Sequence, residues 1–182
     1  MNQTADLTEK TLSREEKYQG SFLSLHVDQV QLPNGRTSFG EVVEHVDGVA
    51  ILALDDRNNV LTVTQYRYVI GKTLLEIPAG KLEPGEDPVA GALRELKEET
   101  GAVPDTFLPM GVTLPSPGCL SERLYLFLAK GLHMESQQLD EDEFLNVERI
   151  PFNEMVHRVM DGEIEDSKTI AAVLKAKVLL NL

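Results

Sequence analysis

Hydrophobic and polar residues alternate along the chain from residue 22 to residue 43, which is the period expected of half-buried β-strands. The alternation breaks at Pro33-Asn34-Gly35, a turn-forming triplet, so this segment predicts a β-hairpin. Residues 1 to about 17 are polar and show no sustained period. We therefore expect a tail or arm ahead of the hairpin.

Short apolar runs bounded by turn-forming residues continue along the chain and predict further strands. These runs cover residues 49–54, 60–66, 74–77, 107–112, 123–129 and 144–147. The clearest break between two of them is the segment 55–59, which consists only of Asp, Arg and Asn.

A helical period replaces the alternation after residue 86. The predicted stripe of this helix consists of Val89, Leu93, Leu96 and Thr100. Asp87 is placed to cap the helix, Pro88 to occupy its first turn and Gly101 to end it. Two more helices are predicted, one beginning near Pro151 and one over residues 167–180.

Strands precede, separate and follow these helices, so we expect an α/β fold with a mixed sheet and helices on its faces. The chain has 182 residues, of which 42% are hydrophobic, enough to bury one sizeable core. We expect an amino-terminal arm and hairpin over residues 1–45, followed by a main domain over residues 46–182.

The charge and the single cysteine narrow the class of protein. Seventeen Lys and Arg against thirty Asp and Glu give a net charge of −13, which repels nucleic acid unless metal ions intervene. The lone Cys119 cannot form an internal disulfide, and the first residues lack the pattern of a secretory signal, so we expect a cytoplasmic protein. No apolar stretch approaches the roughly 20 residues that span a bilayer, and we expect no membrane partner.

Two glutamates of the predicted helix lie one turn apart on the same flank: Glu95 and Glu99. Glu98 lies on the other side of the apolar stripe, where Arg94 can pair with it at the i, i+4 spacing. A solvated charged face explains Arg94 and Glu98, but like charges one turn apart cost stability. A hard divalent cation would remove that cost. The spacing alone favours metal binding only slightly over a charged surface.

The segment from Gly80 to Ala102 resembles the Nudix box. Gly80 is followed after five residues by Glu86 and, after seven more, by RELKEETGA at 94–102, so all nine specified positions match. The box itself covers about 23 residues. The resemblance implies a Nudix-type α/β/α sandwich, in which the box forms a loop, a helix and a loop, and the hydrolysis of a nucleoside diphosphate linked to another group.

The same resemblance implies the metal ligands. It assigns metal ions to Glu95 and Glu99, with Glu98 contributing in some members, and to the backbone carbonyl of Ala79. The expected ion is Mg²⁺, with Mn²⁺ as the alternative.

Two further box residues have supporting roles by resemblance. Arg94 would orient the glutamates through salt bridges. Glu86 would support the loop near the start of the helix, where an acidic residue is also favoured by the helix dipole.

Two segments outside the box resemble the ADP-ribose and nucleoside diphosphate sugar pyrophosphatase branch of the family. They are LLEIPAGKLEPGED at 74–87 and TLPSPGCLSERLYLFLA at 113–129. Pro117 lies sixteen residues after Gly101, as a proline does in this branch, and Gln65-Tyr66-Arg67 also resembles it. The implied substrate is a nucleoside diphosphate sugar, with ADP-ribose and GDP-mannose not separable.

Two charged residues ahead of the box are candidate substrate contacts. The planar guanidinium of Arg67 suits a substrate phosphate, although an ordinary surface charge is an equally good interpretation. Glu76 stands between Leu75 and Ile77 in a short apolar run, so it faces either the nucleoside side of the pocket or, by simple alternation, water.

The acidic run at 140–143 would ordinarily be a solvated loop. The branch resemblance implies that one acid here deprotonates the attacking water and that another, two residues later, contacts a metal. This makes Glu141 the candidate base and Glu143 the candidate metal contact, with a register uncertain by two residues. Glu122 is the reserve candidate for the base. The products from ADP-ribose would be AMP and ribose 5-phosphate.

The remaining candidate residues are interpreted as structural. His26, His45, His133 and His157 lack the spacing of metal ligands, so we expect structural or surface roles. Cys119 has no neighbouring His or second Cys, and a packed thiol is favoured over a nucleophile.

Two alternative functions stay open at this point. One is a non-catalytic Nudix-like sensor of a nucleotide sugar, although such a protein would normally lack box carboxylates. The other is a pyrophosphatase of nucleoside triphosphates or capped RNA. The net charge of −13 argues against RNA, and the resemblance at 113–129 argues against triphosphates. The branch resemblance also implies a homodimer, formed through the amino-terminal hairpin.

Overall fold

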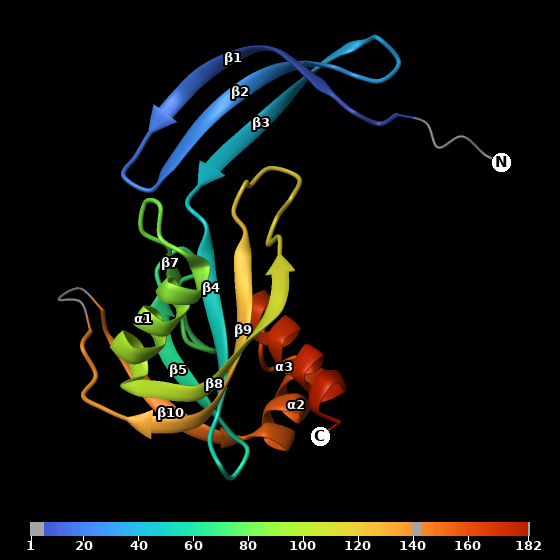
Figure 1. Cartoon of the computed structure of the whole chain (residues 1–182). Coiled ribbons are helices and arrows are strands. Elements are labelled where there is room, and N and C mark those ends of the chain that lie inside the picture. Colours follow the sequence, from blue (N-terminus) through green and yellow to red (C-terminus); the bar gives the residue numbers. More distant parts are fainter. Residues whose placement is uncertain (1–5, 140–142, 182) are drawn as a thin grey trace. The chain divides into compact units, whose positions relative to one another are not determined.

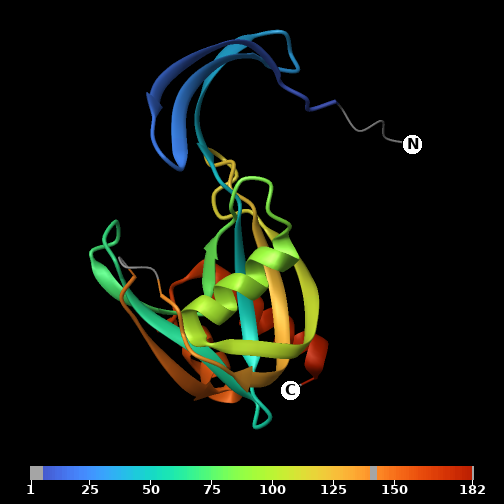
Figure 2. The same ribbon diagram turned by 60° about the vertical axis from the view of Figure 1, so that its left-hand side comes forward.

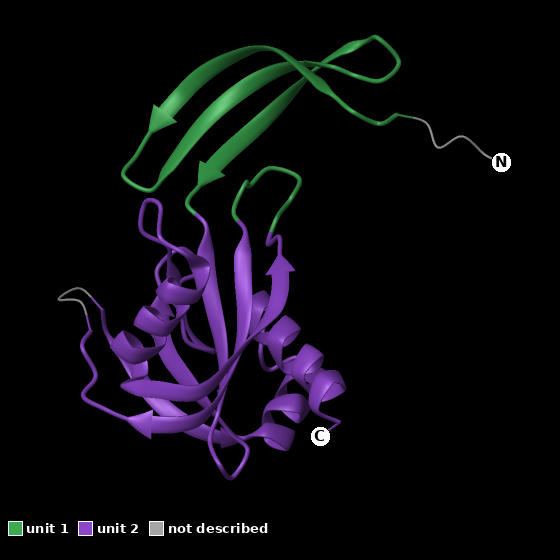
Figure 3. Ribbon diagram, in the orientation of Figure 1, with its two compact units in different colours: residues 1–46, 116–122 green, residues 47–115, 123–182 purple. Residues whose placement is uncertain are grey.

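The computed structural model describes residues 6–139 and 143–181. The chain forms two compact units, shown in different colours in Figure 3. Unit 1 contains residues 1–46 and 116–122, and unit 2 contains residues 47–115 and 123–182. The segment 116–122, which the sequence places in the main domain, thus belongs to unit 1. The dimerisation role of residues 1–45 stays a prediction.

Unit 1 is built on a three-stranded antiparallel sheet with the order β1-β2-β3. The strands are β1 (Lys10–Gln19), β2 (Leu23–Gln31) and β3 (Thr37–His45). The last two form the predicted hairpin, with Leu23 opposite His45 and Gln31 opposite Thr37. Gly35 turns the chain between them with a φ of 81°, a conformation that glycine adopts without steric cost.

No strand was expected in the arm over residues 1 to about 17, but β1 begins within it, at Lys10. All ten residues of this strand are exposed, so its sequence has no buried face to produce an apolar alternation. Backbone pairing with β2 and one charged side chain hold the strand instead. Arg14 donates hydrogen bonds to both carboxylate oxygens of Asp28, at 2.9 and 3.0 Å, and to Glu44 at 2.8 Å.

Unit 2 contains a seven-stranded mixed sheet. Five strands follow the order β10-β5-β4-β9-β8, while β6 pairs with β5 and β7 pairs with β4. The strands are β4 (Gly48–Leu54), β5 (Asn59–Arg67), β6 (Lys72–Glu76), β7 (Ala79–Lys81), β8 (Ala102–Thr113), β9 (Leu124–Met134) and β10 (Leu145–Pro151). Strands β4 and β9 are parallel, and the other pairs are antiparallel, so the predicted mixed sheet is confirmed.

Helices cover both faces of this sheet. They are α1 (Pro88–Thr100), α2 (Phe152–Met160) and α3 (Ser167–Leu180). Figures 1 and 2 show α1 on one face and α2 with α3 on the other, which is the α/β/α sandwich expected from the sequence. In the described part of the chain, no helix is long and apolar enough to cross a membrane.

The central strand β4 divides the core in two. All seven of its residues are buried, as expected for a strand covered on both faces. Ala50, Leu52 and Leu54 belong to the cluster that includes residues of α2 and α3. Val49, Ile51 and Ala53 belong to the cluster that includes Ala92 and Leu96 of α1. The helix α1 is thereby packed on one face of the sheet.

Strand β8 is longer than the predicted run of 107–112, because it begins at Ala102 directly after the helix. The sequence does not predict the full strand because it contains two prolines, Pro104 and Pro109, which are unusual within strands. They are tolerated because β8 lies at the edge of the sheet, where a missing N–H can face away from the neighbouring strand. A register shift between Pro109 and Gly111 accommodates the second proline.

Candidate active site

The box helix α1 begins and ends as predicted. The side chain of Asp87 accepts hydrogen bonds from the backbone N–H groups of Val89 and Ala90, at 3.0 and 3.2 Å. Gly101 ends the helix in the left-handed conformation, with a φ of 73°, and its N–H donates to the carbonyl of Lys97. The caps therefore fix both ends of α1, and the helix between them sets the direction of each side chain.

The buried face of α1 differs from the predicted stripe. Its members are Gly91, Ala92, Glu95, Leu96, Glu99 and Thr100. Val89, expected to belong to the stripe, is 44% exposed. The prediction considered apolar residues alone, whereas Glu95 and Glu99 are only 8% and 2% exposed and take part of the buried face themselves. Two carboxylates are thus placed together away from water.

Strand β7 packs directly against these two carboxylates. The N–H of Ala79 donates a hydrogen bond of 3.0 Å to Glu99. A Cβ atom at Gly80 would lie 2.0 Å from the carboxyl carbon of Glu95, which is closer than any side chain allows. A side chain at the box glycine would therefore force the carboxylate of Glu95 to move from its position.

Burial disfavours the charged forms of Glu95 and Glu99. Burial raises the pKa of Glu99 to about 8, and the negative charges of Glu95 and Glu143 add to the effect. Burial also raises the pKa of Glu95, against the lowering effect of Arg94. Placing ions away from water costs several kcal/mol each unless a counter-charge offsets it. A divalent cation between these oxygens would provide that counter-charge.

Arg94 of α1 binds three carboxylates. Its guanidinium donates to both oxygens of Glu86, at 2.9 and 3.0 Å, and to Glu95 at 3.0 Å. It also donates to Glu98 at 2.8 Å, the i, i+4 pair expected from the sequence. Hydrogen bonds from Arg94 lower the pKa of Glu86 to about 2. The same guanidinium that fixes Glu95 thus also joins the loop before α1 to the helix.

The acidic loop after β9 is attached to the last turn of α1. Gln137 donates its side-chain amide to the carbonyl of Glu99, and the N–H of Gln138 donates to the carbonyl of Glu98 at 3.0 Å. Glu143 follows this attachment, and its negative charge raises the pKa of both candidate metal ligands, Glu95 and Glu99. The candidate base Glu141 lies outside the described residues.

A second charged group surrounds Glu76, at the end of β6. Glu76 is 1% exposed, so the interpretation in which it faces water is wrong. Arg67 donates to its two oxygens at 2.7 and 2.6 Å, and Lys168 of α3 donates to one of them. Arg67 is therefore more than a surface charge, since it pairs with a buried carboxylate. Asp166 caps α3 and accepts a hydrogen bond of 3.0 Å from Lys168.

Sequence reasoning missed Lys168, Asp166 and Gln137. A lysine at the start of an amphipathic helix gives no signal of burial, since lysine is almost never fully buried unless it is paired. Its partner Glu76 lies 92 positions away. The one usable signal was Glu76 itself, because a glutamate inside an apolar strand requires a cation from elsewhere in the fold.

Three of the residues discussed from the sequence lie in the segment 116–122 of unit 1. Pro117 and Cys119 belong to the segment 116–122, as does Glu122, whose carboxylate lies 3.8 Å from the ring of His45. Cys119 is exposed, so the expectation of a packed thiol is wrong. The short turn 116–119 places it at the surface, with its sulfur 3.6 Å from the Ser116 hydroxyl.

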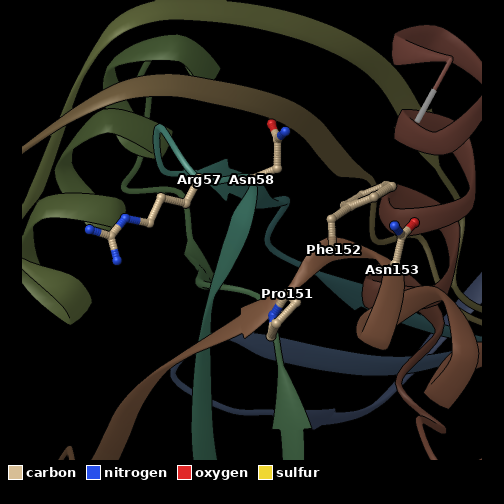
Figure 4. Close-up of a pocket in the computed structure, with 5 residues that line it drawn as sticks. All are labelled: Arg57, Asn58, Pro151, Phe152 and Asn153. Carbon is tan, nitrogen blue, oxygen red and sulfur yellow. The ribbon is translucent and has the colours of Figure 1, made fainter.

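A separate hollow of about 210 Å³ lies where β10 meets α2 (Figure 4). Its lining consists of Arg57, Asn58, Pro151, Phe152 and Asn153. This lining contains none of the predicted site residues and no carboxylate. The acidic face of α1 is therefore the better candidate for metal-dependent chemistry.

Within residues 6–139 and 143–181, no three His, Cys, Asp or Glu side chains form a ready set of metal ligands. Glu95 and Glu99 nevertheless fit a hard cation, because they are buried like charges with oxygen donors. Such an ion would retain waters and take further oxygens from backbone or substrate.

Comparison with known proteins decides the family. A model described as the NUDIX domain matches residues 44–173. The chain belongs to the Nudix family. A second model, described as the nucleoside diphosphate sugar hydrolase N-terminal domain, matches residues 9–39, which include β1 and β2. The predicted family and enzyme class, a Nudix hydrolase, are confirmed, and Nudix hydrolases generally need a divalent metal ion.

Several relatives match over most of their length. The chain is 40% identical to a Bacillus subtilis protein named ADP-ribose pyrophosphatase, covering 92% of this chain and 91% of the relative. It is 42% identical to a Bacillus methanolicus protein named methanol dehydrogenase activator, covering 91% and 90%. A Yersinia enterocolitica protein named GDP-mannose pyrophosphatase is 34% identical and covers 76% and 77%.

A solved structure described as an ADP compounds hydrolase has the same fold. It matches with a TM-score of 0.86 at 21% identity, and the match covers 99% of this chain and 97% of the other. At this identity the likeness concerns the fold alone. The Nudix-type architecture expected from the sequence is thereby confirmed.

Proposed function

We propose that this Nudix hydrolase cleaves the pyrophosphate bond of a nucleoside diphosphate sugar, with ADP-ribose as the preferred substrate and Mg²⁺ as the metal. The observation that carries the proposal is the buried pair Glu95 and Glu99, which needs a cation, in a chain whose relatives at 40% and 38% identity are named ADP-ribose pyrophosphatases. Water adds to one phosphorus and the bridging P–O bond breaks, so ADP-ribose gives AMP and ribose 5-phosphate.

Glu95, Glu99 and the carbonyl of Ala79 would hold the metal, with Glu143 as a further contact. When bound, a divalent cation supplies positive charge that offsets the charge of the diphosphate and makes water more acidic. Arg94 keeps Glu95 in place through its hydrogen bond of 3.0 Å, and it also donates to Glu98 at 2.8 Å.

The proton and the substrate are assigned to other residues. Glu141 would accept the proton of the attacking water as general base. Arg67 would bind a phosphate oxygen through donors not used on Glu76, and Pro117 would shape the substrate loop. Glu76 contributes by anchoring Arg67, at 2.7 and 2.6 Å.

A substrate panel tests this proposal. Purified protein with Mg²⁺ is offered ADP-ribose, GDP-mannose, other nucleoside diphosphate sugars and dinucleotides, and the released monophosphate is measured. We expect the highest kcat/KM with ADP-ribose. A preference for GDP-mannose would overturn the substrate, and release of monophosphate from none of them would overturn the function.

We also propose a homodimer formed through β1 to β3. Several large apolar side chains of this region are exposed: Leu12, Tyr18, Phe22 and Phe39. A second copy would remove them from water. Light scattering would give the mass of a dimer, and deletion of residues 1–45 would abolish solubility or activity. A fully active monomer after that deletion would contradict the proposal.

The cytoplasm is the compartment we propose. The support is the single Cys119, which is exposed as a free thiol. Free exposed thiols persist where the surroundings are reducing.

A second candidate function is the activation of a methanol dehydrogenase. It is favoured by the relative of that name, which is 42% identical over 167 residues. Adding the protein with Mg²⁺ to a purified methanol dehydrogenase would raise the rate of alcohol oxidation if this function holds. An unchanged rate would exclude it without affecting the hydrolase proposal.

A further inference from the structure

We propose that Lys168 is a positioning residue for the substrate diphosphate, which acts by holding Glu76 and, through Glu76, the guanidinium of Arg67. This inference rests on the proposed function, in which Arg67 binds a phosphate oxygen. It adds a residue of α3, outside the box and outside the segments that resemble the nucleoside diphosphate sugar pyrophosphatase branch.

The first step is the burial of Glu76. A carboxylate that is 1% exposed needs cationic partners, because an unpaired buried charge is strongly destabilising. Arg67 supplies two hydrogen bonds and Lys168 supplies one more, to the same oxygen that accepts from Nη2 of Arg67. Glu76 therefore links a strand of the sheet to the first turn of α3.

The second step concerns the donors that Arg67 keeps. A guanidinium has five N–H donors, and Glu76 takes one from Nε and one from Nη2, which leaves three. Among the described residues, Nη1 of Arg67 has no hydrogen-bond acceptor, and the side chain is 38% exposed. The free edge of the guanidinium can thus bind the oxygens of an anion from the solvent side.

The third step is the charge of the group. Arg67 and Lys168 carry two positive charges, while Glu76 and Asp166 carry two negative charges, so the four residues are neutral together. Without Lys168 the remaining three carry a net charge of −1. That charge would repel an incoming diphosphate, and one oxygen of Glu76 would compete more strongly for Arg67.

The position of Lys168 is itself fixed. Its Nζ lies between Glu76 and Asp166, and Asp166 also caps α3 by accepting from the N–H of Thr169 at 3.1 Å. Thr169 in turn accepts a hydrogen bond of 2.9 Å from the N–H of Ile77, next to Glu76. The start of α3 is therefore tied to the end of β6 by both side chain and backbone.

The chain offers a matched control in Lys72. This lysine of β6 pairs with Glu165, which precedes the same helix, but the side chains are 46% and 57% exposed. Lys72→Met and Lys168→Met remove the same charge, and both lysines join the same two regions. They differ in burial and in contact with Glu76.

The test compares hydrolysis of ADP-ribose and binding of inorganic pyrophosphate by calorimetry. We expect Lys168→Met to raise KM and the pyrophosphate Kd about tenfold, with kcat within about threefold of wild type. Lys72→Met should match wild type, and Lys168→Arg, which keeps the charge, should recover most of the binding. A Lys168→Met variant that lowers kcat alone, or binds pyrophosphate as tightly as Lys72→Met, would overturn the proposal.

A double variant covers the outcome in which Lys168→Met does not fold. Glu76→Gln with Lys168→Met removes both members of the buried pair, an exchange that proteins often tolerate. It should fold and still bind pyrophosphate weakly, because Arg67 has lost its anchor. Binding at the wild-type level would contradict the inference. If pyrophosphate binding weakens but ADP-ribose is not a substrate of the wild type, the proposed function fails and the positioning role stands.

Discussion

Two buried acids, Asp28 of unit 1 and Glu99 of unit 2, have pKa values shifted in opposite directions by their neighbours. In unit 1, Asp28 accepts two hydrogen bonds from Arg14, and these bonds hold the pKa of Asp28 below its usual value. In unit 2, the buried Glu99 accepts one side-chain hydrogen bond within residues 6–139 and 143–181, from a backbone N–H, and its pKa is raised to about 8. Both acids are nearly inaccessible to water, at 5% and 2% exposure.

The difference separates a structural acid from a functional one. The charge of a buried acid that has its own arginine is already offset within the protein. A buried acid whose neighbours are Glu95 and Glu143 destabilises the apo protein, and the missing charge has to come from a ligand. Four predictions test this comparison, in order of expected effect.

The largest effect is expected from Glu99→Gln. The substitution removes a metal ligand but keeps the shape and the hydrogen bond from Ala79, so kcat should fall roughly 10⁴-fold or more while the melting temperature of the apo protein stays equal or rises. Kinetics with ADP-ribose and thermal melting in EDTA provide the measurements. Wild-type turnover at saturating Mg²⁺ would end the metal assignment.

The second prediction separates the base from the metal contact. Glu141→Gln should lower kcat by roughly 10²- to 10⁴-fold with little change in KM, because a general base acts in the transition state. Glu143→Gln should instead raise the Mg²⁺ concentration for half-maximal rate, because a lost ligand weakens ion binding. If Glu141→Gln turns over normally while Glu122→Gln is inactive with intact metal affinity, the base is Glu122.

The third prediction concerns the glycine that makes room for Glu95. Gly80→Ala places a Cβ atom 2.0 Å from the carboxyl carbon, so the carboxylate has to move, and metal affinity should fall about 10- to 100-fold. Gly40→Ala is the control, since nothing lies within 4 Å of its Cβ position. Equal metal affinity in both variants would show that Glu95 does not need its observed position.

The smallest effect is expected in unit 1. Because the pKa of folded Asp28 is below its usual value of 3.8, the Arg14 pair contributes stability above about pH 4 that is lost as the pH falls through the folded pKa. Arg14→Met should therefore lower the melting temperature at neutral pH and match wild type in strong acid. Lys17→Met, which breaks the exposed pair with Glu15, serves as control. A difference that persists in strong acid would contradict the assignment to Asp28.

Local patterns were sufficient for much of unit 2. The caps Asp87 and Gly101 fixed the box helix at the residues where the structure begins and ends it, and α3 covers the predicted 167–180. Both helices carry their signals within a few residues. The spacing of the box predicted Glu95 and Glu99 as metal ligands, also from residues that lie close together in the sequence.

The parts that sequence reasoning missed depend on distant partners. Strand β1 has no buried face and is recognisable only beside β2. Lys168 is buried because Glu76, at the end of another element, requires a cation. The exposure of Val89 follows from two glutamates that occupy the buried face of α1, and a count of apolar residues does not include them.

The most direct test of the metal site is the binding of Mn²⁺, followed by electron paramagnetic resonance in the absence of substrate. Wild-type protein and Glu154→Gln, which changes an exposed acid of α2, should bind the ion with equal affinity. Glu95→Gln and Glu99→Gln should each weaken binding at least about tenfold, because each removes a carboxylate ligand. Unchanged Mn²⁺ affinity in the double variant Glu95→Gln with Glu99→Gln would contradict the account.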